Sequence, residues 1–294
     1  MFPTHHRTVD VDGRTVFYRE AGDPSAPVLL LLHGAPASSF MFRELIPLLA
    51  DRYHLVAPDY LGLGLSDAPT VDEFHYTFDH LTEVVEGFLT ALGIHEFAMY
   101  VQDYGAPVGW RLLLRDPARI TAIISQNGNA YEEGFVDSFW APLWRYSVDH
   151  DAADETILRD SLTVEKIRWQ YTHGLLDPTV VSPDAWLHDA AQVNRPGNPE
   201  VQLALYDDYP SNRRLYPAVH EVLRRTQKPL LAVWGENDEI FAPAGARAFA
   251  NDLPSAEIVL LDGGHFLLES HLEQVAARIR SFLGAQLLVL GGAR

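Results

Sequence analysis

The sequence predicts an α/β fold in which helices flank a mostly parallel central sheet and a helical cap is inserted after the sixth strand. Short β-rich runs alternate with helical stretches over residues 1–128 and again from residue 229, which is the rhythm of a doubly wound parallel sheet. Residues 129–216 are instead rich in Trp, Tyr, Asp and Pro and contain no strand-like run. We therefore expect one core, residues 1–128 and 217–294, interrupted by a cap at 129–216.

Apolar runs and their periodicity define the elements of the first part. Residues 8–11 and 14–20 predict a hairpin that turns at an Asp-Gly pair. Val28–Leu32 is an unbroken apolar run, as expected for a strand that is buried on both faces. The elements that follow are a helix over 38–49, a strand at 53–57, a helix over 78–92 that stops at Gly93, a strand at 97–101, a helix at 108–114 and a strand at 120–124.

The same rhythm returns after the insertion. We predict a strand at 229–234, a helix at 243–251, a strand at 258–261 and a helix at 272–283. Pro243 fits the first turn of its helix, where a missing N–H costs little. A helical insertion between two strands of one sheet explains the interruption better than a second independent domain.

Composition excludes several classes of function. The 294 residues include no cysteine, so disulfides, thiolate metal sites and a cysteine nucleophile are excluded. No apolar run approaches the roughly 18 residues of a membrane helix, and the first residues lack the apolar core of a secretory signal. We expect a cytoplasmic protein that does not contact membranes. The net charge of −18 repels phosphate backbones, so no nucleic-acid partner is expected.

Asp103 is the strongest candidate for a catalytic residue. It lies in the segment 101–107, Val-Gln-Asp-Tyr-Gly-Ala-Pro, where a buried strand is expected to end and a helix to begin. This arrangement is typical of a nucleophile elbow, in which a strained turn lifts one side chain above the sheet. Aspartate is also preferred at the start of a helix, so a purely structural cap is the alternative interpretation.

The segment 33–36, His-Gly-Ala-Pro, directly follows the strand Val28–Leu32. In a site built around an elbow, this loop supplies one backbone N–H of an oxyanion hole, and the residue after the nucleophile supplies the other. The donors would be the N–H groups of Ala35 and Tyr104. A simple strand-to-helix turn built from Gly and Pro is the alternative.

An acid and a histidine follow the last two predicted strands. Asp238 ends the segment Trp-Gly-Glu-Asn-Asp, and His265 ends the segment Leu-Asp-Gly-Gly-His. Because the carboxyl ends of parallel strands meet at one edge of a sheet, we expect both side chains to lie near Asp103. The chain order is that of a nucleophile, an acid and a base.

With these motifs, the chain resembles the α/β-hydrolases of the epoxide hydrolase and haloalkane dehalogenase branch over nearly its whole length. Residues 59–67 are similar to the family's D-x-x-G-x-G-x-S segment. The resemblance implies an α/β-hydrolase fold without a cofactor or a metal. It also implies that Asp103 is the nucleophile, His265 the base and Asp238 the acid that orients the base.

An aspartate nucleophile narrows the reaction class. Its attack on an acyl carbon would give an anhydride, whereas attack on an sp³ carbon gives an ordinary alkyl ester. The expected partners are therefore water and a small apolar organic substrate with an electrophilic saturated carbon. His265 would then activate the water that hydrolyses the ester. No serine lies in a G-x-S-x-G context, which argues against a serine esterase.

Epoxide opening also needs a proton donor for the alkoxide, and relatives that open epoxides carry cap tyrosines for this task. Residues 208–212, Asp-Tyr-Pro-Ser-Asn, are similar to their Tyr-Arg-x-Asn segment, so Tyr209 is the expected acid. Tyr171 and then Tyr146 are the alternatives, with His173 after them. The residues expected to contact the substrate are His33, Pro36, Trp144, Tyr146 and Trp169.

Several alternatives remain open at this stage. Dehalogenases of this branch usually carry Trp after the nucleophile, and one large group has Asn after the His-Gly pair, where this chain has Tyr104 and Ala35. We therefore expect hydrolysis of epoxides to vicinal diols, with haloalkane or haloacid dehalogenation as the alternative. A ligand-binding protein on a hydrolase fold is the alternative of another class, and a homodimer is left open. The alternative residues are Glu132 or Glu133 as the acid, and Trp140, Trp144, Trp169 or Trp186 as halide donors.

Overall fold

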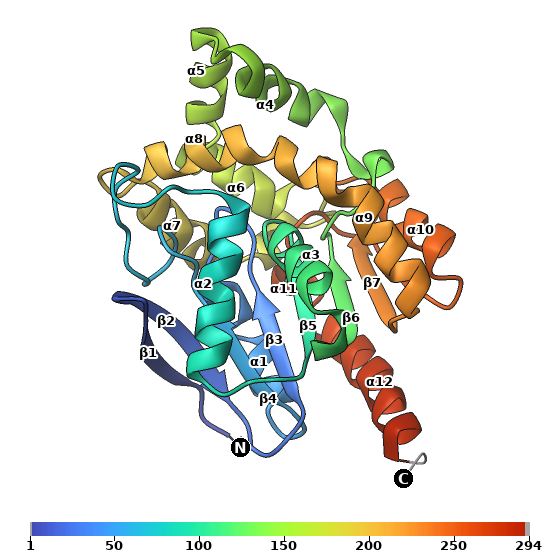
Figure 1. Cartoon of the computed structure of the whole chain (residues 1–294). Coiled ribbons are helices and arrows are strands. Elements are labelled where there is room, and N and C mark those ends of the chain that lie inside the picture. Colours follow the sequence, from blue (N-terminus) through green and yellow to red (C-terminus); the bar gives the residue numbers. More distant parts are fainter. Residues whose placement is uncertain (1, 292–294) are drawn as a thin grey trace.

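Eight strands form a single sheet in the computed structural model, which describes residues 2–291 (Figure 1). Their order is β1-β2-β4-β3-β5-β6-β7-β8. The pairs β1–β2 and β2–β4 are antiparallel, and all other neighbours are parallel. The strands are β1 (His5–Val11), β2 (Arg14–Ala21), β3 (Val28–Leu32), β4 (His54–Pro58), β5 (Phe97–Gln102), β6 (Ile120–Gln126), β7 (Leu230–Gly235) and β8 (Glu257–Leu261).

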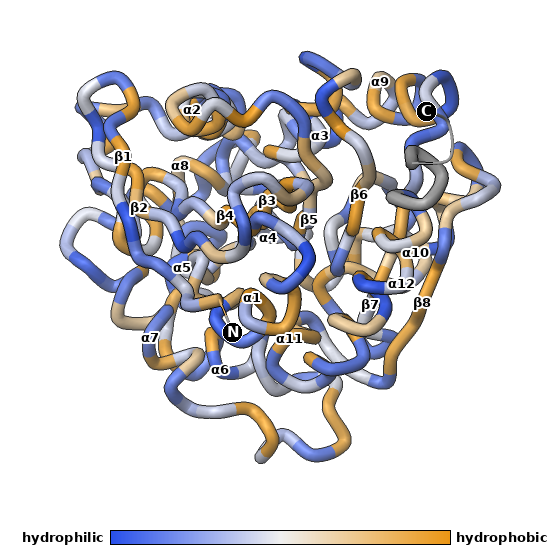
Figure 2. Tube along the Cα trace, turned by 90° about the horizontal axis from the view of Figure 1, so that it is seen from below, coloured by the Kyte–Doolittle hydropathy of each residue, from blue (hydrophilic) through white to orange (hydrophobic). Residues whose placement is uncertain are grey.

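Helices cover both faces of this sheet. Figure 2 shows α2 and α3 on one side of the strands and α1 and α11 on the other. Alternate residues of β3 enter two separate apolar clusters, Leu30 and Leu32 in one, Leu29 and Leu31 in the other, as expected for a strand that is buried on both faces. The core helices are α1 (Leu45–Leu49), α2 (Phe78–Ala91), α3 (Gly105–Arg115), α10 (Pro243–Asp252), α11 (Leu267–Ser270) and α12 (Leu272–Gly291).

The predicted helix over 38–49 is wrong in its extent. The structure has a short 3-10 turn, η1 (Ser39–Phe42), followed by the five-residue α1. Pro47 lacks an N–H and could not bond to residue 43 in a continuous α-helix. The helix therefore begins late enough for Pro47 to fall within its first turn, where no such bond is needed.

The segment between β6 and β7 is helical, as expected, and lies over the carboxyl ends of the parallel strands (Figure 1). Its last helix, α9, runs without a break through residue 216, where we expected the cap to end, and contacts the core helices α3 and α10. The helices are α4 (Asp137–Asp149), α5 (Ala152–Asp160), α6 (Val164–Thr172), α7 (Pro183–Val193), α8 (Asn198–Asp208) and α9 (Pro210–Thr226). The short 3-10 turns are η2 (Pro117–Arg119), η3 (Glu132–Gly134) and η4 (Pro178–Val180).

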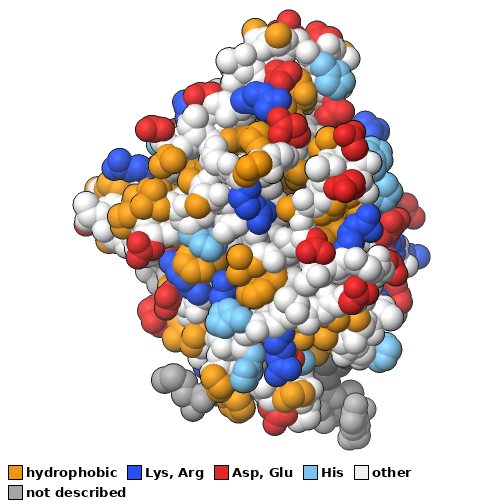
Figure 3. All heavy atoms as spheres, turned by 90° about the vertical axis from the view of Figure 1, so that its left-hand side faces the viewer, with side chains coloured by type: hydrophobic (Ala, Val, Ile, Leu, Met, Phe, Trp, Pro, Cys, Tyr) orange, Lys and Arg blue, Asp and Glu red, His pale blue; other side chains and the backbone are white. Residues whose placement is uncertain are grey.

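The surface mixes charged and apolar side chains. Figure 3 shows one face on which acidic, basic and hydrophobic groups are interspersed. Among residues 2–291, no helix combines the length and apolar character needed to cross a lipid bilayer.

Candidate active site

Asp103 stands at a sharp turn between β5 and α3. Its φ of 48° lies in the left-handed region, which costs a non-glycine residue about 1–3 kcal/mol and is characteristic of functional turns. The turn requires a glycine at position 105, because a Cβ there would lie only 2.1 Å from the carbonyl oxygen of Leu32. Backbone strain therefore lifts the carboxylate above the sheet edge, as an elbow requires.

Two backbone N–H groups hold the Asp103 carboxylate. The N–H of Ala35 donates to Oδ1 at 2.8 Å, and the N–H of Tyr104 also bonds to this side chain. Burial raises the pKa of Asp103 above its usual value, while the His265 charge and these two N–H groups act in the opposite direction. Both expected oxyanion donors therefore lie at the carboxylate in the resting enzyme.

His265 joins Asp103 to Asp238. Its Nδ1 lies 2.9 Å from Oδ2 of Asp238, and its Nε2 lies 3.8 Å from Oδ2 of Asp103. Burial would lower the pKa of His265, but the carboxylates of Asp238 and Asp103 outweigh it and raise that pKa above its usual value. The structure thus brings together the three residues that the sequence singled out, in the geometry of a nucleophile, a base and an orienting acid.

Two amides at the end of β6 support this triad, and the sequence reasoning missed both. Asn127 donates to Oδ2 of Asp238 at 2.5 Å, and Gln126 donates to the backbone carbonyl of His265 at 3.0 Å. Asn127 itself has a φ of 47°, so a second turn at a strand end holds a functional side chain. A buried Gln-Asn pair directly after an apolar strand was the signal that could have identified them.

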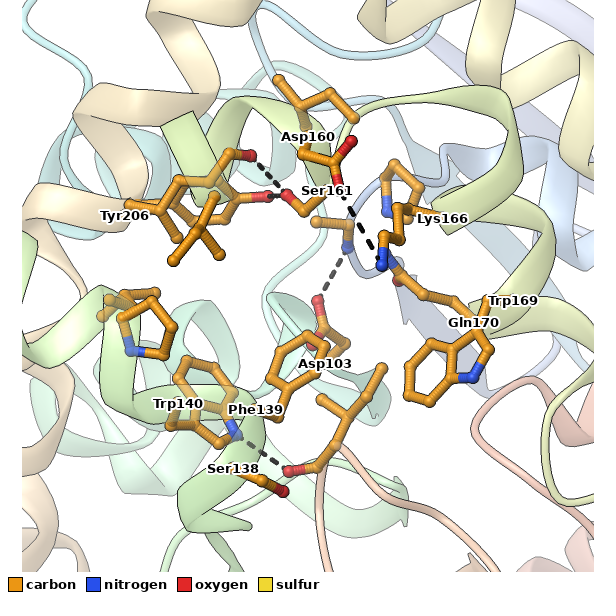
Figure 4. Close-up of a pocket in the computed structure, with 18 of the residues that line it drawn as sticks. Asp103, Ser138, Phe139, Trp140, Asp160, Ser161, Lys166, Trp169, Gln170 and Tyr206 are labelled. Atoms are coloured by element: carbon orange, nitrogen blue, oxygen red, sulfur yellow. Dashed lines mark hydrogen bonds and ion pairs between the residues drawn. The ribbon is translucent and has the colours of Figure 1, made fainter. Parts of the chain in front are cut away.

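The carboxylate of Asp103 opens into a cavity of about 470 Å³ under the cap (Figure 4). Its walls come from the loop after β3, the elbow and the cap helices α4, α5, α6 and α8. Of the expected substrate contacts, Pro36 and Trp169 line this cavity, as do Ala35 and Tyr104. The volume is in the range of pockets that enclose a drug-sized organic ligand.

The other expected contacts lie elsewhere. His33 is fully buried and its ring nitrogens contact the carbonyl of Gly34 and the N–H of Tyr60, so it shapes the loop rather than the cavity wall. Trp144 packs against Phe135, Trp140 and Arg213, and Tyr146 packs edge-on against His150. These three residues therefore do not line the cavity, contrary to the sequence-based expectation. Which face of a cap helix points to the cavity depends on its packing against other helices, and the sequence does not show this packing.

The expected proton donors are also placed differently. The Tyr171 hydroxyl donates to Asp189, and its ring stacks on Phe266 at 3.9 Å between centroids, so it joins the cap to the core outside the cavity lining. Tyr209 is buried against the rings of Trp140 and Tyr104. Neither belongs to the lining residues.

Tyr206 is the tyrosine of the cap that lines the cavity, and the sequence reasoning missed it. Its hydroxyl lies 3.2 Å from Oγ of Ser161 (Figure 4). Burial raises the pKa of Tyr206 to about 12, with the Ser161 hydrogen bond lowering it and the Asp103 charge raising it. It lies three residues before Tyr209, at the end of α8 to which the similarity in sequence pointed.

The remaining alternatives also have defined positions. Glu132 pairs with Arg213 at the surface, and Glu133 is exposed, whereas Asp238 occupies the site beside the base. The indole of Trp140 lines the cavity but donates its N–H to the carbonyl of Ile240 at 2.8 Å.

Comparison with known proteins identifies the family to which the chain is similar. A family model described as the alpha/beta hydrolase fold matches residues 27–272. An uncharacterized hydrolase of Saccharomyces cerevisiae is 43% identical over 280 residues, covering 94% of this chain and 96% of the relative. A haloalkane dehalogenase of Mesorhizobium japonicum is 28% identical over 285 residues, covering 92% and 88%.

Solved structures show the same fold. The crystal structure of DbjA has a TM-score of 0.83 at 21% identity and covers 97% of this chain and 98% of its own. The crystal structure of an epoxide hydrolase from Vigna radiata has a TM-score of 0.76 at 24% identity, with 96% and 98% covered. At such identities the likeness extends to the fold alone.

Proposed function

The chain belongs to the α/β-hydrolase family and is a hydrolase, and we propose that it opens epoxides to vicinal diols through a covalent ester on Asp103. The observation that carries this proposal is a carboxylate, rather than a hydroxyl, at the elbow and 3.8 Å from the Nε2 of His265. A carboxylate nucleophile gives a hydrolysable ester only when it attacks a saturated carbon.

In the first step, an Asp103 oxygen attacks one epoxide carbon. The ring C–O bond breaks, and its oxygen takes a proton from a tyrosine hydroxyl. We place Tyr206 first for this role, because its hydroxyl lies at the cavity wall and its pKa is influenced by the Asp103 charge. Tyr209 is the alternative, since its pKa is influenced by the same charge although it is not among the residues that line the cavity.

In the second step, water attacks the ester carbonyl of Asp103 and gives a proton to Nε2 of His265. The backbone N–H groups of Ala35 and Tyr104 stabilise the negative charge on the carbonyl oxygen. The Cγ–O bond to the alcohol then breaks, and the departing oxygen takes the proton from Nε2 of His265, so that the diol leaves and His265 is neutral again. The new carboxylic acid of Asp103 gives its proton to the tyrosinate. Asp103 is again a carboxylate, so one water is consumed for each epoxide.

The cavity favours a bulky apolar epoxide. Aromatic and aliphatic side chains dominate its walls, and its volume of about 470 Å³ exceeds what a two- or three-carbon substrate fills. Apolar area removed from water contributes about 25 cal/mol per Å², so an aryl or long-chain epoxide gains binding energy that a short one lacks. The lining residues with the largest apolar side chains are Phe139, Trp140, Leu143, Ile157, Leu158, Leu162, Trp169 and Ile240.

Dehalogenation of haloalkanes is the second candidate. It is supported by the relatives named haloalkane dehalogenases and by Trp169, whose indole lines the cavity. A halide ion needs N–H donors, and the indole N–H of Trp140 is already bound to a carbonyl.

A direct comparison of products tests the proposal. Aryl and alkyl epoxides and chloro- or bromoalkanes of matched size are incubated with the enzyme, and diol and halide are both quantified. We expect diol formation to be the faster reaction. Halide release that exceeds diol formation would replace the proposal with the dehalogenase. An Asp103→Asn variant is the control, because it should abolish either reaction.

A further inference from the structure

Gln102, the last residue of β5, contacts the catalytic base directly. Its side chain is fully buried, and its amide nitrogen lies 2.9 Å from Nε2 of His265. Its amide oxygen Oε1 is also buried, and no described residue forms a hydrogen bond with it. Burying an amide oxygen unpaired costs about 1–3 kcal/mol, so the position of this oxygen calls for an explanation.

The contact selects one form of His265. Because Nδ1 donates to Asp238, a neutral imidazole carries its lone pair on Nε2, where the Gln102 N–H can donate. An imidazolium would instead point its own N–H at the N–H of the amide. The charged groups that face His265 are Asp238 and Asp103, and both favour the imidazolium. Gln102 therefore acts against them.

Gly34 fixes where the amide stands. A Cβ at that position would lie 2.1 Å from Oε1 of Gln102, 2.4 Å from Cβ of Asp103 and 3.0 Å from Oδ1 of Asp103. Oε1 therefore lies beside the aspartate whose ester carbon the water must reach. A side chain in place of Gly34 would displace the amide from both catalytic residues.

We propose that Gln102 is a positioning residue for ester hydrolysis, which keeps His265 a neutral base and binds the attacking water. This inference rests on the proposed function. In the ester, the water takes the place of the amide N–H at Nε2, donating one hydrogen to Nε2 and the other to Oε1. Its oxygen bonds to Cγ of Asp103, its proton passes to Nε2, and Gln102 is unchanged at the end.

Two variants test this role. Gln102→Leu keeps the approximate volume but removes the amide, and Gln102→Glu keeps the shape but places an acceptor against Nε2. Gln202→Leu is the matched control, because Gln202 is also a buried glutamine with an unpartnered Oε1, but its amide nitrogen donates to Asn198 rather than to His265.

The first measurement is the NMR titration of the His265 ring without substrate, assigned by its loss in a His265→Gln variant. Removing a donor to the neutral form should raise the pKa of His265 by about one unit in Gln102→Leu, and further in Gln102→Glu. Gln202→Leu should leave it unchanged. A pKa in both Gln102 variants equal to that of the wild type would overturn the proposal.

The second measurement is single-turnover hydrolysis of the ester, followed by quenched-flow mass spectrometry. Hydrolysis should slow by about 10- to 100-fold in Gln102→Leu, at the lower end of what a positioned base contributes, while ester formation changes by less than about threefold. Hydrolysis at the wild-type rate refutes the role of Gln102. Absence of any ester, even in the wild type, refutes the proposed function instead, and the titration still decides whether Gln102 holds His265 neutral.

Discussion

At the scale of single residues, burial and neighbouring groups have opposite effects on the ionisation of Asp103 and His265. Asp103 is surrounded by protein, and burial alone would favour its neutral acid. The N–H of Ala35 and the nearby His265 favour the ionised form that attacks a substrate. His265 is balanced in the same way between burial and two carboxylates. The pKa of a group in such a balance changes strongly when a single neighbour is lost.

The identity of the proton donor is tested by two conservative variants. Tyr206→Phe removes the hydroxyl at the cavity wall and keeps the ring, so ester formation should slow by about 10²- to 10⁴-fold. Hydrolysis of ester already formed should stay near the wild-type rate. The measurement is rapid-quench ester formation under single-turnover conditions.

Tyr209→Phe is the matched variant at a tyrosine that does not line the cavity, and it should slow ester formation by less than about tenfold. The reverse ranking of the two variants would return Tyr209 to the role that the sequence suggested for it.

At the scale of elements, the elbow depends on the close crossing of α3 over β3. Gly105 has no room for a methyl group against the carbonyl of Leu32, and the adjoining Asp103 takes a left-handed conformation. Packing between a helix and a strand therefore maintains the strain that positions the nucleophile.

Substitution at this crossing should affect both stability and activity. Gly105→Ala is expected to lower the free energy of unfolding by about 1–3 kcal/mol through overpacking and to displace Asp103. Gly284→Ala is the control, because its Cβ would meet no atom within 4 Å inside α12, and alanine in a helix should stabilise by up to about 1 kcal/mol. Urea unfolding measures the free energy of unfolding of both variants. An equal change in the two variants would show that α3 and β3 do not pack closely at Gly105.

The core elements, and the closeness of Asp103, Asp238 and His265 to one another, could be predicted from the sequence because their signals are local. An apolar run indicates each buried strand, and a candidate side chain follows within four residues of the strand end, as for Asp103, Asp238 and His265. The cap offered no such marker. Tyr206 and Tyr209 are three residues apart at the junction of α8 and α9, and only the packing of the cap decides which of them faces the cavity.

At the scale of the whole molecule, the cap covers the carboxyl edge of the sheet (Figure 1), and its helices form most of the wall of the cavity that Asp103 lines. Asp103 is 5% exposed and His265 3% exposed. A substrate that enters is thus separated from bulk water, and electrostatic effects inside the site are stronger than they would be in solution. The resulting pKa shifts give the complete reaction a defined pH dependence.

The ester is expected to accumulate in mildly acidic solution. As pH falls, His265 is protonated first, because its pKa is raised above 6.5, and the protonated ring cannot take a proton from water. At a lower pH, Asp103, whose pKa is raised above 3.8, becomes protonated in the free enzyme and no longer attacks. In the ester, Asp103 carries no charge. The pKa of His265 at that stage is therefore set chiefly by Asp238.

Intact mass spectrometry after acid quench at steady state measures the fraction of enzyme present as the ester at each pH. The fraction should pass through a maximum between the two transitions. A fraction that rises steadily toward alkaline pH would contradict these assignments of base and nucleophile.

The central claim is that Asp103 forms a covalent ester with the substrate, and a trapped intermediate tests it most directly. His265→Gln should leave the first step intact and stop the second, because no base remains to activate water. After exposure to an epoxide that the wild type converts, the intact mass of the variant should rise by one substrate mass. Digestion should place that mass on Asp103, and a His265→Gln, Asp103→Asn double variant should gain none. Consumption of one equivalent of epoxide without a gain in mass, or with the mass on another residue, would contradict the account.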